Sequence, residues 1–198
     1  MKNNIFERNI IKTIIFFLLI FTCVLDVMLT TAYNFYKKGE KETNQIYTPD
    51  PVFHHGLKMS FKSEVSDILG PYSIYSNSLG FRDKASRNIL LKSESHRILF
   101  MGDSFTEGIL LNYEDTFVGI IDSKLSTKPI EVLNAGVQGY SPIIYWRKLK
   151  YLIEEVGLKI NEVVVFIDFS DPINELAYKL NDDLTIATIP KNAQGLQN

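Results

Sequence analysis

The chain has 198 residues, of which 45% are hydrophobic and 22% are charged, and its formal net charge is -2. This is the composition of a globular protein with room for one domain and an accessory segment. The near-neutral charge balance, without a lysine and arginine stripe, argues against a nucleic-acid partner. A single cysteine, Cys23, excludes a disulfide framework and a thiolate metal cluster. We expect neither a metal ion nor a cofactor.

The first element along the chain is an apolar segment that follows a short tail, residues 1–9. Its core, Ile14–Leu25, has the length of a signal-peptide core, and extension over Ile10–Leu29 makes it long enough to span a bilayer. We expect residues 10–32 to form an uncleaved signal anchor, with a cleaved signal peptide as the alternative. A buried core helix is disfavoured, because the segment is apolar on all sides. Lipidation of Cys23 is disfavoured, because the residues before it are not small.

The orientation of this anchor does not follow from charge. Three Lys or Arg residues precede the span and three follow it shortly, so the positive-inside rule does not decide. The short tail and the signal-like layout place residues 1–9 in the cytoplasm and the body outside it. We therefore expect a single-pass membrane protein with an extracytoplasmic domain.

Residues 33–51 are polar and contain two prolines, which predicts a linker, and residues 52–90 form an N-terminal flap or extension. Two pairs within the extension are candidates for a function. The pair His54-His55 makes a poor joint ligand set, because adjacent side chains on an extended chain point to opposite faces. The pair Arg82 and Asp83 is expected to fix the flap as an ion pair, or else to let Arg82 contact an anionic substrate.

From Arg97 onward, strand patterns alternate with helix patterns, which predicts a β-α-β-α-β unit with a parallel sheet covered on both faces. A helix is expected from about Asp115, and a second from Ser141-Pro142, with serine as N-cap and a glycine C-cap at Gly157. The run Glu162–Ile167 is apolar throughout, as a central strand buried on both faces would be. A short helix is expected from Pro172 through Leu180. The fold class is therefore α/β, with a three-layer α/β/α arrangement.

Three loops follow the three predicted strands and share the carboxyl edge of the sheet, where ligands collect. They contain Gly102-Asp103-Ser104, the segment from Asn134 to Gly139, and Asp168-Phe-Ser-Asp171. The hydroxyl of Ser104 is the candidate nucleophile. Backbone N–H groups of Ser104 and Gly139 are candidate donors for an oxyanion hole.

These blocks, in this order, resemble the SGNH (GDSL-like) hydrolase superfamily, over roughly residues 50–180. The resemblance implies a flavodoxin-like fold, Ser104 as nucleophile, and an oxyanion hole that includes Gly139 and the residue at the position of Ser170. It implies supporting roles for Asp103, Asn134 and Asp171. The flap and the anchor resemble a bacterial envelope branch that hydrolyses or transfers acyl groups, which we expect to be acetyl esters of cell-surface polysaccharide.

Two departures from the family pattern bear on activity. Ser170 stands where the family has an asparagine that donates to the oxyanion, and a hydroxyl is a shorter, less fixed donor. The family also takes its general base from an Asp-x-x-His near the end of the domain, whereas His96 is the last histidine here. We therefore expect residues 91–198 to be an SGNH-like domain that is incomplete at its C-terminus.

Other interpretations of the same residues are weaker or remain open. A phosphate-binding P-loop needs a lysine after Gly108, where Ile109 stands, and an aspartyl-phosphate enzyme needs an aspartate where Phe105 stands. Ser104 could serve only as a helix N-cap. The main alternative to a serine esterase or O-acyltransferase is a non-catalytic envelope protein that binds glycan or an assembly partner.

Overall fold

The computed structural model describes residues 9–67 and 70–190. These fall into two compact units, one within Met1–Thr43 and one within Asn44–Asn198, which we describe separately.

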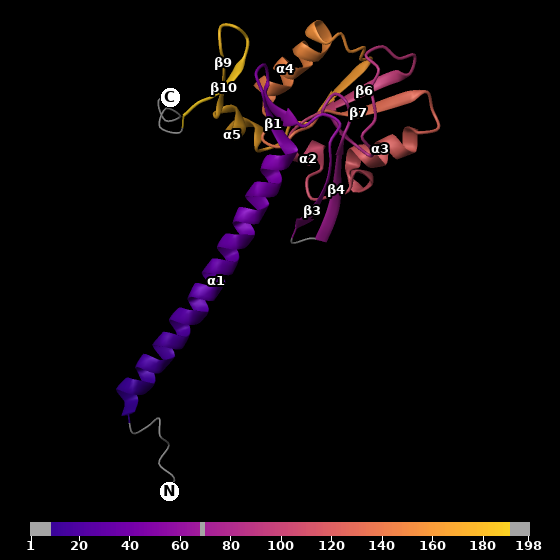
Figure 1. Cartoon of the computed structure of the whole chain (residues 1–198). Coiled ribbons are helices and arrows are strands. Elements are labelled where there is room, and N and C mark those ends of the chain that lie inside the picture. Colours follow the sequence, from indigo (N-terminus) through magenta and orange to yellow (C-terminus); the bar gives the residue numbers. More distant parts are fainter. Residues whose placement is uncertain (1–8, 68–69, 191–198) are drawn as a thin grey trace. The chain divides into compact units, whose positions relative to one another are not determined.

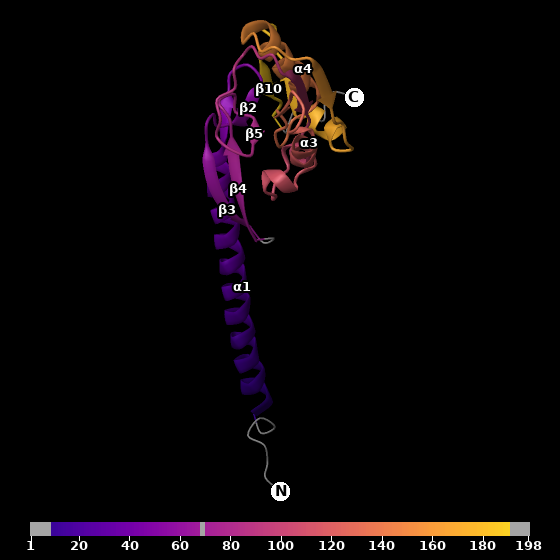
Figure 2. The same cartoon turned by 90° about the vertical axis from the view of Figure 1, so that its right-hand side faces the viewer.

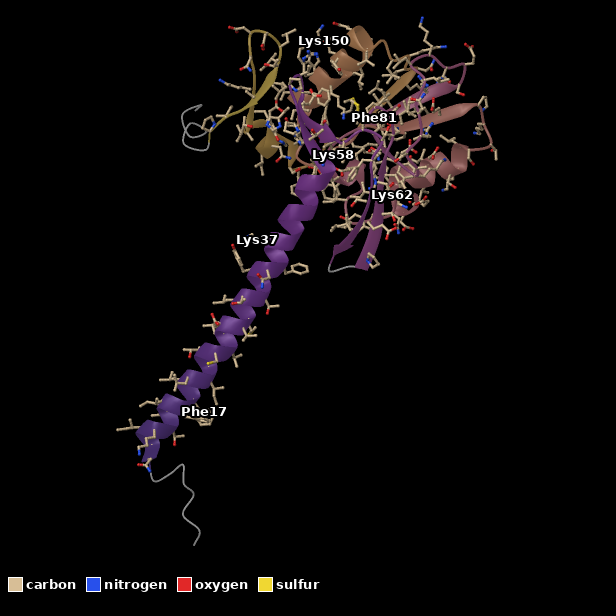
Figure 3. The ribbon with its side chains drawn as sticks, viewed as in Figure 1. Phe17, Lys37, Lys58, Lys62, Phe81 and Lys150 are labelled. Atoms are coloured by element: carbon tan, nitrogen blue, oxygen red, sulfur yellow. The ribbon has the colours of Figure 1, made fainter. Side chains whose placement is uncertain are left out.

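The first unit consists of most of helix α1 (Ile10–Ile46), whose last three residues belong to the second unit. Its apolar side chains project on all sides, and Phe17 near one end is exposed (Figure 3). The segment Ile10–Phe35, 26 residues, is long and apolar enough to cross a membrane, a test that a signal sequence also passes. The polar segment expected to be a linker over 33–51 is not irregular. It continues α1 to Ile46 and then forms strand β1.

The second unit is built on a six-stranded sheet in the order β3-β4-β5-β7-β6-β8. The three strands of the expected β-α-β-α-β unit pair in parallel, with β6 between β7 and β8. The other three strands are antiparallel to their neighbours, and Figure 2 shows β3 and β4 side by side. The strand bounds are β3 (Lys62–Asp67), β4 (Gly70–Ser76), β5 (Arg82–Asp83), β6 (His96–Met101), β7 (Ile130–Asn134) and β8 (Glu162–Val165).

Helices connect the parallel strands, and two short hairpins complete the unit. The helical elements are α2 (Ser104–Glu107), the 3₁₀ turn η2 (Tyr113–Asp115), α3 (Phe117–Leu125), α4 (Pro142–Lys150), the π-helical turn η3 (Tyr151–Glu155) and α5 (Asp171–Glu175). The hairpins are β1 (Tyr47–Asp50) with β2 (His54–Leu57), and β9 (Tyr178–Leu180) with β10 (Ile186–Thr188). The helix expected to run from Pro172 through Leu180 therefore ends early, and its last residues form a strand.

Helices α3 and α4 lie on either side of strands β6 and β7 (Figure 1). Alternate strand residues face them: Leu99 packs in the cluster that includes Ile144 of α4, whereas Phe100 packs with Val118 of α3. From β6 the chain crosses to the neighbouring strand β7, and from β7 it crosses back over β6 to β8. The two crossovers therefore run in opposite directions along the sheet. Right-handed crossovers in these two directions put the two helices on opposite faces.

Two expectations about the sheet are wrong. The sheet is mixed rather than parallel, because strands of the predicted flap join it through the pairing of Arg82 in β5 with Asn134 in β7. Strand β8 is also an edge strand and not a central one. The relative solvent exposures of Val163 and Val165 are 36% and 44%, because β8 pairs with β6 alone among the described strands.

Candidate active site

Ser104 is placed by an abrupt change from strand to helix. Strand β6 ends at Met101, and Asp103 caps helix α2 by accepting a 2.9 Å hydrogen bond from the Phe105 N–H. Ser104 is the first residue of that helix, so its own N–H has no partner within the helix, and its side chain is half-buried. The helix lasts four residues and ends at Gly108, whose φ of 75° is left-handed.

The position of Ser104 in the sheet is one where α/β proteins bind ligands. The loop after β6 leads to α3 on one face, and the loop after the adjacent strand β7 leads to α4 on the other. In open α/β sheets, ligands bind outside the carboxyl ends of the strands, at the point where neighbouring loops diverge in this way. Ser104 and the segment Asn134–Gly139 lie on the two sides of that point.

The structure brings the three predicted loops together around residues 102–106. The second loop bonds there twice, through the Val137 N–H to the Gly102 carbonyl at 3.1 Å and the Asn134 amide to the Thr106 carbonyl at 2.7 Å. The third loop reaches the same turn through Ser170, whose hydroxyl donates to Asp103 Oδ2 at 3.2 Å.

Gly102 is required by this close approach. A Cβ at this position would lie 2.1 Å from the Thr106 hydroxyl oxygen and 3.2 Å from the Phe166 carbonyl oxygen. Any larger residue would displace Thr106 within the turn that carries Ser104 and would crowd the Phe166 carbonyl.

Gly139 adopts a φ of 77°, which a side chain would strain. The carbonyl before it, that of Gln138, bonds to His55 Nε2 at 2.8 Å, and its own carbonyl accepts from the Tyr178 hydroxyl at 2.9 Å. Among the described residues no acceptor bonds to the Gly139 N–H. The loop therefore holds this N–H in a fixed direction and leaves it free to donate.

Two buried ionisable side chains, which sequence reasoning missed, hold the same loop. Glu107 accepts from the Gln138 N–H at 2.6 Å and from the Tyr47 hydroxyl at 2.8 Å. Burial raises the pKa of Glu107 above its ordinary value, and its two hydrogen bonds and the charge of Arg82 oppose that rise.

Lys148 of α4 is the second, and it is 2% exposed. Its ammonium donates to the Ala135 carbonyl and to the Tyr140 hydroxyl, each at 3.1 Å, and lies 5.2 Å from the centre of the Phe53 ring. Burial lowers the pKa of Lys148 to about 7, against the attraction of Asp50 and Glu107.

Carboxylates surround Ser170. The Ser170 N–H bonds to Asp168 Oδ1 at 2.6 Å, and the Asp168 N–H bonds to Asp171 Oδ2 at 2.7 Å. Asp171 is buried and accepts from the Tyr145 hydroxyl at 2.6 Å. Burial and the charge of Asp168 raise the pKa of Asp103. The Ser170 hydroxyl is thus directed at a carboxylate and not at the open side of the loop.

The three histidines contact other groups, and no hydrogen bond joins any of them to Ser104. His96 pairs with Glu162 at 2.7 Å at the opposite end of the strands. His54 and His55 meet each other through their Nδ1 atoms at 2.7 Å, so the expectation that they point to opposite faces is wrong. Among the described residues no three His, Cys, Asp or Glu side chains are grouped to hold a metal ion.

Arg82 and Asp83 do not pair with each other as expected. Arg82 donates to the carbonyls of Ser73 and Leu111, whereas Asp83 binds Arg87 at 2.8 Å. Both side chains are buried and stabilise the junction of the extension with the sheet, and the charge of Arg82 also acts on Glu107 beside the loops around Ser104.

The site therefore places Ser104 at the carboxyl end of β6, where three polar loops meet at residues 102–106. No protein-family model and no curated protein matches the chain. Among solved structures, the chain is similar to AlinE4, a SGNH-hydrolase family esterase, and to a point mutant of that esterase. In both cases the identity is 23% and the TM-score 0.35, over 43% of this chain and 44% of the esterase. The chain thus spans less than half the length of the esterase that it matches.

Proposed function

We propose that this chain carries the nucleophile and oxyanion hole of an SGNH-type serine ester hydrolase or O-acyltransferase. The observation that supports this most is the meeting of three polar loops at residues 102–106. The Gly139 N–H, which bonds to no acceptor among the described residues, follows Gln138, and the Gln138 N–H bonds to Glu107 in the helix that begins at Ser104. The resemblance of the three sequence blocks to the SGNH superfamily points the same way.

In the proposed reaction, Ser104 Oγ attacks the carbonyl carbon of an acyl ester and loses its proton to a base. The carbonyl oxygen becomes an oxyanion that accepts from the N–H groups of Ser104 and Gly139. The C–O bond to the leaving alcohol then breaks, and the alcohol takes up a proton. Water or a second hydroxyl attacks the acyl-serine in the same way, which gives hydrolysis or transfer. The Ser170 hydroxyl becomes a third donor only after it leaves Asp103.

The missing element is the base. No histidine in the chain bonds to Ser104, and an unassisted serine hydroxyl is a weak nucleophile at neutral pH. We expect this chain to acylate slowly, through its oxyanion donors alone. The proposed substrates are acetyl esters, with O-acetylated cell-surface polysaccharide as the favoured class. We propose that the reaction uses no cofactor.

The test compares the full chain with its Ser104→Ala variant in detergent micelles, on 4-nitrophenyl acetate, with and without added imidazole as an external base. We expect acetyl transfer to Ser104, seen by mass spectrometry of the peptide that contains it. We also expect imidazole to accelerate the wild type beyond its effect on the Ser104→Ala variant. Equal rates and no acetylated peptide would overturn the assignment of Ser104 as nucleophile.

A second function is favoured by one observation, the bond between the Ser170 hydroxyl and Asp103. In SGNH hydrolases the side chain at this position donates to the oxyanion, whereas here it is occupied by the bond to Asp103. A domain that only binds glycan or an assembly partner would tolerate the loss of this donor. Binding of O-acetylated polysaccharide that is equal in wild type and Ser104→Ala, with no acetyl-serine in either, would favour this alternative.

We propose further that α1 anchors the protein and that its domain lies outside the cytoplasm. The apolar segment Ile10–Phe35 supports the anchor, and the signal-like layout of basic residues followed by an apolar run supports the orientation. Protease added to intact cells should then digest the domain, whereas digestion only after lysis would reverse the orientation.

A further inference from the structure

The peptide bond between Gln138 and Gly139 holds two atoms that matter to the proposed site. Its carbonyl oxygen belongs to Gln138, and its N–H, the candidate oxyanion donor, belongs to Gly139. No cis peptide bond occurs among the described residues. In a planar trans peptide the C=O and N–H point in opposite directions. Whatever holds the carbonyl therefore also aims the N–H.

The side chain that holds this carbonyl is His55, whose Nε2 lies 2.8 Å from the Gln138 oxygen. A carbonyl oxygen only accepts hydrogen bonds, so Nε2 must carry the hydrogen. Burial lowers the pKa of His55 to about 4, so the ring is neutral at pH 7 and its Nδ1 is an acceptor. The hydrogen bond also polarises the peptide, which makes the N–H on its other side a stronger donor.

His54 fixes this tautomer. Its Nδ1 lies 2.7 Å from His55 Nδ1, and since that atom accepts, His54 Nδ1 must donate. His54 Nε2 then accepts from the Thr188 hydroxyl at 2.7 Å. The donors and acceptors therefore run in one direction, from Thr188 through His54 and His55 to the Gln138 carbonyl.

The backbone is strained where the two rings meet. His54 has a φ of 79°, in the left-handed region that a histidine rarely adopts. This conformation turns its ring toward that of His55, at 4.9 Å between centroids, where an extended strand would have separated them. Strain of this kind persists only where the surrounding structure enforces it, and it is concentrated at functional sites.

We infer that the His54–His55 pair is a positioning relay that aims the Gly139 N–H at the oxyanion, with His55 as the residue that orients the peptide. This inference rests on the proposed function and gives the histidines a role other than that of the base. The relay holds the peptide from one side, while Glu107 holds the preceding N–H from the other.

The test uses the full chain and three variants. His55→Leu removes the donor, His55→Gln keeps an N–H at a similar reach, and His96→Leu is the matched control, because His96 bonds to Glu162 far from the loop. For acetylation by 4-nitrophenyl acetate, we expect His55→Leu to lower the turnover about 10²–10³-fold, as loss of an oxyanion donor does, with little change in KM. We expect His55→Gln to recover most of the rate and His96→Leu to match the wild type.

A spectroscopic arm decides the question independently of activity. Nitrogen NMR of the wild type should show hydrogen on Nε2 of His55 and on Nδ1 of His54. The Gly139 amide should shift and exchange faster in His55→Leu but not in His96→Leu, with unchanged circular dichroism. The opposite tautomers, or an unchanged Gly139 amide in His55→Leu, would overturn the relay.

The two proposals fail separately. If Ser104→Ala does not alter the rate, the proposed function fails, and the NMR arm still tests the relay. If Ser104→Ala abolishes acetylation while His55→Leu keeps the full rate, the serine stands and the relay is wrong. If His55→Leu alone is misfolded, the pair of His55→Gln and His54→Leu replaces it in both arms.

Discussion

The carboxylate of Glu107 accepts a 2.6 Å hydrogen bond from the backbone N–H of Gln138, and this bond joins the turn after Ser104 to the loop that holds Gly139. The Glu107 carboxylate is buried, so it cannot readily exchange this partner for solvent. The turn and the loop should therefore move as one body.

We expect Glu107→Ala to destabilise the protein more than Glu107→Gln. Alanine removes the carboxylate that accepts from the Gln138 N–H and the Tyr47 hydroxyl, and the hydroxyl keeps only a 3.4 Å contact with Gln138 Oε1; a loss of about 1–3 kcal/mol is expected. Glutamine can accept from the N–H with its oxygen and donate to the hydroxyl with its amide, so its cost should be small. Urea unfolding in detergent micelles measures both, with the exposed Glu94→Ala as control. Equal losses for alanine and glutamine would contradict this role.

Stability should rise with pH above neutrality because of Lys148. Its folded pKa is about 7, whereas a lysine in the unfolded chain keeps its proton to about 10.4. Between these values the unfolded state binds the extra proton, so the free energy of unfolding increases with pH, by up to about 1.4 kcal/mol per unit.

Urea unfolding at several pH values between about 7 and 9 measures this slope. Tyrosines in the unfolded chain titrate only above this range. Lys148→Met should remove most of it, and Lys150→Met, on the exposed side of the same helix, should not. A wild-type slope equal to that of Lys148→Met would show that the lysine stays charged in the fold.

The order of the three parallel strands with the helices between them, and the meeting of the three loops, followed from sequence pattern. Gly157 ends the helical segment with a φ of 74°, as a C-cap glycine should. The position of β8 did not follow. Apolar periodicity reports which residues avoid water, but not how many strands flank them, and so Val163 and Val165 looked central while lying at an edge.

The contacts around the loop were also beyond simple pattern rules. Alternation along a strand separates neighbouring side chains, yet the left-handed φ of His54 joins the two imidazoles. Lys148 did leave a signal, because it shares the buried helix face of Ile144 and Tyr145 at helical spacing. A lysine on such a face must find buried partners, which here are the loop and its tyrosine.

A buried arginine outside the site should matter more than its exposed neighbour. Arg97 is 1% exposed and binds Glu131 at 2.6 Å, and it also donates to the carbonyls of Leu90 and Leu91. Arg87 binds the same carboxylate at 2.6 Å, but its side chain is 34% exposed. We expect Arg97→Met to cost about 3–5 kcal/mol, and Arg87→Met clearly less, because its partners Asp83 and Glu131 keep other donors. Denaturant unfolding of both variants measures these losses in the free energy of unfolding. Similar losses would show that burial does not make the Arg97–Glu131 pair more stabilising than the Arg87–Glu131 pair.

Ser170→Asn should increase the rate of acetyl transfer to Ser104. The serine hydroxyl has one hydrogen, which it gives to Asp103 at 3.2 Å. An asparagine amide has two, so it can keep that bond and still donate to an oxyanion. One added donor is worth up to about 10²–10³-fold in turnover. The measurement is the rate of Ser104 acetylation by 4-nitrophenyl acetate, with Ser170→Ala as the control that removes the hydroxyl. If the hydroxyl already serves the oxyanion, Ser170→Ala will be slow and asparagine will add little. If it serves only Asp103, alanine will leave the rate close to that of the wild type, and asparagine alone will raise it.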